Sequence, residues 1–141
     1  MPPSHRVVFV CEHGAAKSVI AAAEFNALAK TRGASVHAIA RGTVPDPAFA
    51  PTVVDQLTRE GADLGALVPT ALAVSDVEGA LRVVTFDQSQ VQSMVPNDVP
   101  VESWDGLPPV SADFAQAREA IRARVQALWA QMERRSAHGA A

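Results

Sequence analysis

A cysteine, a lysine and a serine lie close together near the N-terminus and could together handle an oxyanion: Cys11, Lys17 and Ser18. An apolar run, Val7–Val10, leads directly into Cys11, and a run with helical apolar spacing begins at Ser18. A loop that feeds a helix N-terminus presents unpaired backbone N–H groups and the positive end of the helix dipole, which attract a phosphate-like anion. The same field favours a thiolate, so we expect Cys11 to be a nucleophile. The alternative is a buried, inert cysteine that ends a core strand.

The residues between the cysteine and the lysine complete the predicted oxyanion site, together with Lys17 and Ser18. They are Glu12, His13, Gly14, Ala15 and Ala16. His13 could also donate a proton or protect the thiolate, because histidine titrates near neutrality. The alternative is that the side chains of Glu12 and His13 face solvent.

The segment that begins at Cys11 resembles the active-site loop of the low-molecular-weight protein tyrosine phosphatases and of the thioredoxin-coupled arsenate reductases of the same fold. The family pattern is a strand, a cysteine, five residues, an arginine, a serine and a helix. The resemblance implies that Cys11 is the nucleophile and that Ser18 hydrogen-bonds its thiolate. Lys17 stands where the family has arginine, and lysine cannot make the bidentate contact of a planar guanidinium. We therefore expect oxyanion binding to survive better than transition-state stabilisation. Gly14 stands where the family usually has an asparagine, and glycine lacks the side-chain hydrogen bonds of that residue.

Weaker matches to the family follow in the expected order along the chain: Ala40–Thr43, Glu60–Leu64, Arg82–Phe86, Trp104 and the apolar pattern of 114–128. Arg41, within the first match, replaces a small residue and could supply the guanidinium that Lys17 does not; the alternative is an ordinary exposed arginine. Aromatic residues line the pocket mouth in tyrosine-selective members. The candidates for that position here are Phe49, Phe86 and Trp104.

The general acid of family phosphatases is an aspartate in an Asp-Pro pair near the C-terminal helix. Counted from Trp104, that position holds Pro108 in this chain. A shift of a few residues would bring Asp105 or Asp113 to the pocket, although Asp105 precedes a glycine as in a plain turn and Asp113 could instead stabilise the start of the last helix. A further candidate is Asp46, in a Pro-Asp-Pro sequence that otherwise predicts a surface turn.

The composition is typical of one globular domain that folds without disulfide bonds, a metal ion or a cofactor. The chain has 141 residues, 48% of them hydrophobic, and a net charge of −3 with no basic run, which argues against nucleic-acid binding. A single cysteine excludes an intramolecular disulfide, and the N-terminus lacks the apolar core of a signal peptide. The apolar runs are too short for a membrane span, and no set of residues has metal-ligand spacing. We therefore expect a cytoplasmic protein with no membrane association, metal or cofactor.

Strands and helices are predicted to alternate along the chain. The strands are expected near Val7–Val10, Ser35–Ala40, Arg82–Phe86 and Val99–Ser103, with a short one near Leu67–Val68, and the helices near Ser18–Arg32, Pro51–Gly61, Ser75–Gly79 and Ala112–Arg135. This alternation predicts an α/β fold, a doubly wound, mostly parallel four-stranded sheet with helices on both faces. The domain is expected to span residues 1–135, followed by a disordered tail over 136–141. Ligands of such sheets bind beyond the carboxyl ends of the strands, where Cys11 would lie.

The resemblance implies a Cys-dependent phosphomonoester hydrolase with a cysteinyl-phosphate intermediate, acting weakly on a phosphorylated substrate. One alternative is an arsenate reductase, which would need an external low-molecular-weight thiol because the chain has no second cysteine. The other is a non-catalytic oxyanion or phosphoprotein-binding module, which Lys17 and the missing Asp-Pro pair favour.

Overall fold

Four parallel strands form one sheet in the computed structural model, which describes the chain outside residues 1–4, 62–67, 87–90, 92, 111 and 140–141. The spatial order is β2-β1-β3-β4, and every neighbouring pair is parallel. The strands are β1 (Arg6–Cys11), β2 (His37–Gly42), β3 (Arg82–Phe86) and β4 (Val101–Trp104). β1 and β3 lie inside the sheet and are buried over almost their whole length, as expected for strands that are covered on both faces.

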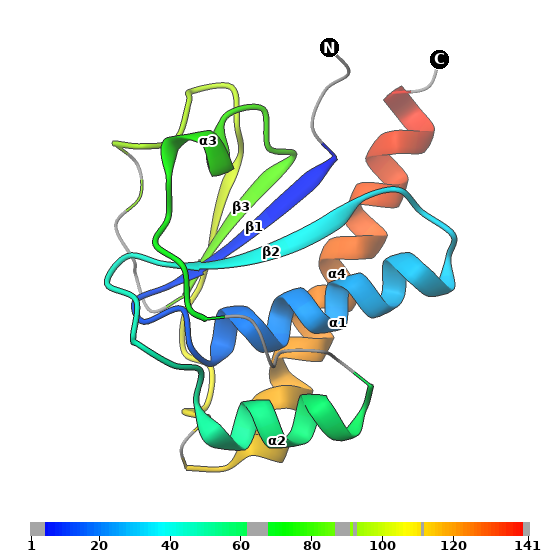
Figure 1. Ribbon diagram of the computed structural model, residues 1–141. Coiled ribbons are helices and arrows are strands. Elements are labelled where there is room, and N and C mark those ends of the chain that lie inside the picture. Colours follow the sequence, from blue (N-terminus) through cyan, green and yellow to red (C-terminus); the bar gives the residue numbers. More distant parts are fainter. Residues whose placement is uncertain (1–4, 62–67, 87–90, 92, 111, 140–141) are drawn as a thin grey trace.

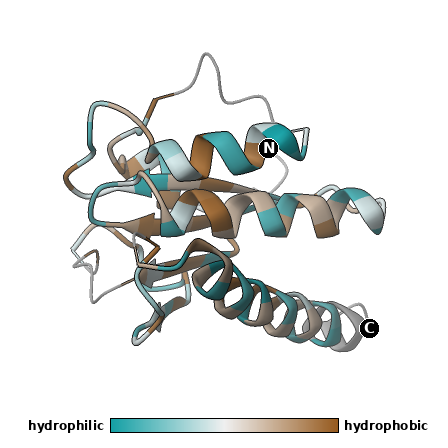
Figure 2. Cartoon of the chain, turned by 90° about the horizontal axis from the view of Figure 1, so that it is seen from below, coloured by the Kyte–Doolittle hydropathy of each residue, from teal (hydrophilic) through white to brown (hydrophobic). Residues whose placement is uncertain are grey.

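Helices cover the two faces of this sheet unequally (Figure 1). The helices are α1 (Lys17–Thr31), α2 (Pro51–Arg59), α3 (Val74–Val77) and α4 (Phe114–Gly139). α1 contacts β1, β2, α2 and α4, whereas the single turn of α3 lies on the other side of the sheet. Hydrophilic and hydrophobic residues are interspersed along the helices (Figure 2). The pattern of one buried face is clearest in α2, whose buried residues, Val53 and Leu57, are one helical turn apart.

The alternation of side chains along β1 creates two hydrophobic clusters, one on each face. Val7, Phe9 and Cys11 belong to the larger cluster, with residues of α1, α2 and α4. Val8 and Val10 belong to the smaller cluster, which α3 and the segment before β4 cover. Cys11 therefore lies on the face of α1, at the carboxyl end of a strand between two others.

The predicted α/β fold with a parallel four-stranded sheet is confirmed, and the boundaries differ in places. β2 and β4 begin about two residues later than predicted, because each starts where the neighbouring strand supplies a partner: Arg6 pairs with His37, and Val83 pairs with Val101. The prediction of a short strand near Leu67–Val68 is wrong for Val68, which is not in a strand. Leu67 lies outside the described residues. An isolated bridge instead joins Gly42 to Ala71.

α4 continues to Gly139, so the disordered tail that we expected from Ser136 is helical up to that residue. The sequence that follows Arg135 holds no proline and no glycine before Gly139, so nothing in it ends the helix earlier. Residues 140–141 lie outside the described part of the chain. No described helix is long and apolar enough to cross a membrane.

Candidate active site

Cys11 ends β1 and is buried, with 7% of its surface exposed. Its Sγ atom lies 3.0 Å from Ser18 Oγ and accepts a hydrogen bond from the backbone N–H of Gly14 at 3.2 Å. Ser18 is itself fully buried in the first turn of α1. These contacts place the sulfur at the floor of the loop, beside one backbone N–H donor and one buried hydroxyl group.

The carbonyl groups of the loop point away from the sulfur, towards the segment 43–50 that follows β2. The carbonyl oxygens of Cys11, Glu12, His13 and Ala15 accept hydrogen bonds from the backbone N–H groups of Thr43, Val44, Asp46 and Ala50, at 2.7–3.2 Å. In a trans peptide, the N–H group points opposite to the preceding carbonyl. The N–H groups of residues 12, 13, 14 and 16 therefore face the other way. The bond from Gly14 N–H to the sulfur confirms this direction for one of them.

Helix α1 begins immediately after this loop, and its N-terminus has no side-chain cap. The N-cap residue, Ala16, has no side-chain oxygen that could accept a hydrogen bond from the N–H groups of the first turn. Lys17, the first residue of the helix, is half-buried. The loop thus offers inward N–H groups and a helix N-terminus, both of which favour an anion beside the sulfur, and Lys17 is the basic residue that begins this helix.

Two glycines allow the loop to lie against the end of β2. Gly14 has a φ of +61°, and a Cβ at this position would lie 2.9 Å from Gly42 N. A Cβ on Gly42 would lie 2.8 Å from Gly14 N and 2.9 Å from the carbonyl carbon of His13. The family's asparagine could not be accommodated at position 14 without moving β2, so the glycine does more than omit a hydrogen-bonding side chain.

Three titratable side chains lie at the exposed rim of the loop. His13 Nδ1 lies 3.1 Å from Asp46 Oδ1, and His13 Nε2 lies 3.8 Å from Glu12 Oε2. All three side chains are about half exposed or more, at 54%, 47% and 66% for His13, Asp46 and Glu12. The sequence singled out both His13 and Asp46, but their pairing emerges only from the fold.

The other candidates for the general acid have local partners. Asp113 Oδ1 accepts a hydrogen bond from the backbone N–H of Gln116 at 3.1 Å, so this carboxylate caps the N-terminus of α4. This is the alternative role that the sequence suggested for Asp113. Asp105 is exposed, follows β4 and accepts from Ser103 Oγ at 3.1 Å. β3 separates β4 from β1, so Asp105 lies two strands away from Cys11 along the same edge of the sheet.

Arg41 does not supply a guanidinium to the site. Its Nε donates to Asp76 Oδ2 of α3 at 3.0 Å, and its Nη1 donates to the carbonyl of Ala40 at 2.8 Å. Arg41 pairs with Val10, so its side chain lies on the face of α3, whereas Cys11 is one residue further along and lies on the face of α1. The prediction that Arg41 supplies the guanidinium missing at position 17 is therefore wrong.

Two of the aromatic residues expected at the pocket mouth lie in the core instead. Phe86 and Trp104 are 0% and 1% exposed and pack edge to face, with ring centroids 5.6 Å apart. Phe9 packs against both rings. Phe49, in the segment that holds the loop, is half-buried and stays a candidate for the mouth.

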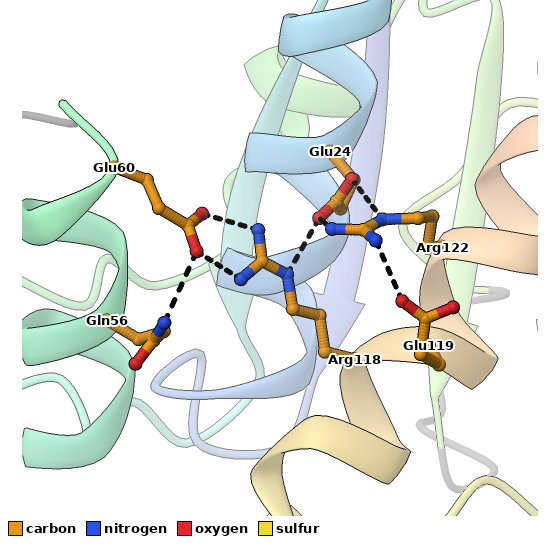
Figure 3. Close-up of polar contacts among 6 residues, drawn as sticks. All are labelled: Glu24, Gln56, Glu60, Arg118, Glu119 and Arg122. Atoms are coloured by element: carbon orange, nitrogen blue, oxygen red, sulfur yellow. Dashed lines mark hydrogen bonds and ion pairs between the residues drawn. The ribbon is translucent and has the colours of Figure 1, made fainter.

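An ion-pair cluster that the sequence analysis missed joins α1, α4 and the end of α2 (Figure 3). Arg118 donates to both Glu24 and Glu60, and Arg122 donates to Glu24 and Glu119. The Arg118 guanidinium lowers the pKa of Glu60, and the hydrogen bond to Glu24 raises the pKa of Arg122. The spacing of Arg118 and Arg122 by one helical turn was the signal available in the sequence. The cluster borders a groove of about 740 Å³, whose lining includes no residue of 11–18.

The structure is thus that of an α/β protein in which a cysteine, a loop and a helix N-terminus lie together at the carboxyl edge of a parallel sheet. The chain belongs to the low molecular weight phosphotyrosine protein phosphatase family, whose model matches residues 6–138. No curated protein matches the chain. In the described residues, no group of three or more histidines, cysteines and carboxylates is placed to hold a metal ion.

Solved structures similar to this chain include both arsenate reductases and phosphatases. A thioredoxin-dependent arsenate reductase from Corynebacterium glutamicum is 24% identical with a TM-score of 0.73, over 93% of this chain and 63% of that one. An arsenate reductase from Archaeoglobus fulgidus is 29% identical with a TM-score of 0.66, over 86% of this chain and 97% of that one. A low molecular weight protein tyrosine phosphatase from Bacillus subtilis is 21% identical with a TM-score of 0.75, over 92% of this chain and 97% of that one. This chain therefore spans less than two thirds of the Corynebacterium protein's length, and similarities below 25% identity establish the shared fold alone.

Proposed function

We propose that this protein hydrolyses phosphomonoesters through a cysteinyl-phosphate intermediate. The observation that carries the proposal is the environment of Cys11, whose sulfur is held by Ser18 Oγ at 3.0 Å and by Gly14 N–H at 3.2 Å at the base of a loop with inward N–H groups. Membership of the phosphatase family agrees with this chemistry.

The proposed reaction has two steps. The Cys11 thiolate attacks phosphorus, an S–P bond forms, and the P–O bond to the leaving group breaks as the leaving oxygen takes a proton. Water then attacks the cysteinyl phosphate and releases inorganic phosphate and the thiolate. The loop N–H groups and the Lys17 ammonium would stabilise the equatorial oxygens, while Ser18 would stabilise the thiolate when it leaves. Asp105 stays a candidate proton donor on the β4 side.

Turnover of p-nitrophenyl phosphate tests the proposal. Cys11→Ser should abolish hydrolysis, since a serine hydroxyl in the same place is a far weaker nucleophile. Phosphate binding by Cys11→Ser, measured by calorimetry, shows whether the loop is still formed. Wild-type turnover in the Cys11→Ser variant would contradict the proposal.

Lys17 provides the second arm of the experiment. Lys17→Arg should raise kcat/KM for p-nitrophenyl phosphate by up to about 10²-fold if the loop accepts the bidentate clamp, and Lys17→Ala should lower it by about 10²–10³-fold. Lys30, at the other end of α1, is the chain's other lysine, and Lys30→Ala is the matched control, with unchanged kcat/KM. Equal rates for Lys17→Ala and wild type would exclude Lys17 from the site.

Arsenate reduction is the second candidate function, favoured by the 29% identity to an arsenate reductase over 86% of this chain. With a single cysteine, the chain would need an external thiol to resolve its arsenic adduct. Arsenite production from arsenate and glutathione, without hydrolysis of p-nitrophenyl phosphate, would select this function. Phosphate binding without either activity would select a binding module.

A further inference from the structure

The leaving group of the proposed reaction departs towards the exposed rim of the loop. In phosphoryl transfer, the attacking and leaving atoms lie roughly in line on opposite sides of phosphorus. The attacking sulfur is at the floor, 7% exposed, and Ser18 beneath it is fully buried. A substrate enters from solvent, so its leaving oxygen lies on the rim side. A general acid must therefore reach the site from the rim.

The His13 side chain is solvent-exposed in this loop, and one residue, Asp46, holds His13 at two points. The backbone N–H of Asp46 donates to the carbonyl of His13 at 3.0 Å, and the side chains meet at 3.1 Å between Nδ1 and Oδ1. Prolines precede and follow Asp46, and their rings restrict the backbone on both sides of the carboxylate. The position of the imidazole is thus set by a rigid turn.

The carboxylates around the ring match a doubly protonated imidazolium. Asp46, from the segment after β2, accepts at Nδ1, and Glu12, from the loop itself, faces Nε2. An imidazolium carries an N–H on both nitrogens, so each N–H faces a carboxylate. The distance from Nε2 to Glu12 Oε2 is 3.8 Å, which exceeds a hydrogen bond, so this contact does not hold the Nε2 proton against transfer.

We infer that His13 is the proton donor to the leaving group and that Asp46 is its positioning residue. The inference rests on the proposed phosphatase function. When sulfur attacks phosphorus and the P–O bond breaks, the Nε2 proton passes to the leaving oxygen and leaves a neutral imidazole. In the second step, the imidazole takes a proton from the attacking water as the S–P bond breaks, which restores imidazolium and thiolate. The pair would thus replace the aspartate that the family places where this chain has Pro108.

The leaving group dependence of kcat/KM tests the assignment, because p-nitrophenolate leaves readily without a proton and phenolate does not. His13→Asn is the sharpest variant, since the amide nitrogen takes the place of Nδ1 and keeps the bond to Asp46. We expect kcat/KM to fall about 10²–10⁴-fold for phenyl phosphate and much less for p-nitrophenyl phosphate. The alkaline limb of the pH profile, where wild type loses its acid proton, should disappear.

Asp46→Asn should act through His13. The amide oxygen still accepts the hydrogen bond from Nδ1, so kcat/KM for phenyl phosphate should fall less than in His13→Asn, and kcat/KM for p-nitrophenyl phosphate should again change least. His37→Asn, on an exposed residue of β2, controls for loss of an imidazole and should change nothing. Asp55→Asn, on an exposed side chain of α2, is the matching carboxylate control.

Three results would overturn the inference. If His13→Asn lowered kcat/KM equally for both esters, His13 would only stabilise the loop and would not be the proton donor. Selective loss on phenyl phosphate in Asp105→Asn, with His13→Asn unaffected, would give the role to Asp105. A wild-type protein inert on both esters would instead remove the proposed function itself, and the inference with it.

Discussion

Gly42→Ala provides a direct test of how the end of β2 shapes the oxyanion loop. The added Cβ would lie 2.8 Å from Gly14 N, 2.9 Å from His13 C and 3.1 Å from Glu12 O, where ordinary contact begins near 3.4 Å. All three are backbone atoms of the loop, so no side chain can rotate out of the way. The backbone of Gly42 cannot easily move away from the loop. Its N–H donates to the carbonyl of Thr70 and its carbonyl accepts from the N–H of Leu72, both at 2.9 Å.

The expected loss follows from this mismatch of about 0.6 Å between the closest contact of 2.8 Å and ordinary packing at 3.4 Å. Overpacking of this kind typically costs about 1–3 kcal/mol of folding free energy. A displacement of about 1 Å in a reacting geometry lowers rates by about 10²-fold, so we expect kcat/KM to fall by about 10-fold to 10²-fold. Urea unfolding and p-nitrophenyl phosphate turnover measure the two effects, and the inhibition constant of phosphate reports the loop directly.

Gly33→Ala is the matched control, because it changes stability without touching the site. A Cβ added at Gly33 would meet no atom within 4 Å, but the φ of +65° is left-handed, which costs a non-glycine residue roughly 1–2 kcal/mol. We expect a stability loss similar to that of Gly42→Ala, with wild-type kcat/KM. If Gly42→Ala also kept wild-type kcat/KM and phosphate inhibition, the close approach of the two glycines would not shape the site.

Two predictions concern the stability of the helices around the site. Asp113→Ala should lower the free energy of unfolding by about 1 kcal/mol, because it removes the cap on Gln116 N–H, and Asp113→Asn should restore most of it in urea unfolding. Glu60→Gln should destabilise the protein at pH 7, and its deficit should shrink as the pH falls below the ordinary glutamate pKa of 4.5, because Arg118 lowers the pKa of Glu60 in the folded state. Wild type keeps this contribution above the unfolded pKa and loses it as Glu60 protonates, so unfolding at pH 7 and pH 3 measures it. A deficit that is the same at both pH values would contradict the ion pair.

The sequence alone predicted the features that depend on residues adjacent in the chain. An apolar run, a cysteine, a loop of small residues and a helical pattern are contiguous, so Cys11 at a strand end before a helix N-terminus follows from local rules. The order of strands and helices, and the α/β class, follow for the same reason. The cap at Asp113 was also available, because it joins residues three positions apart.

The tertiary structure decided the contacts between segments that lie far apart in the chain. The approach of Gly14 to Gly42, the pairing of His13 with Asp46 and the ion pairs of Arg118 each join separate elements. Arg41 was misplaced because the sequence puts it near the site, whereas the alternation of side chains along β2 turns it to the face of α3. Such contacts depend on the register and packing of the sheet, which hydrophobic periodicity does not specify. The position of Cys11 before a helix could therefore be predicted from the sequence, whereas the residues that surround its loop could not.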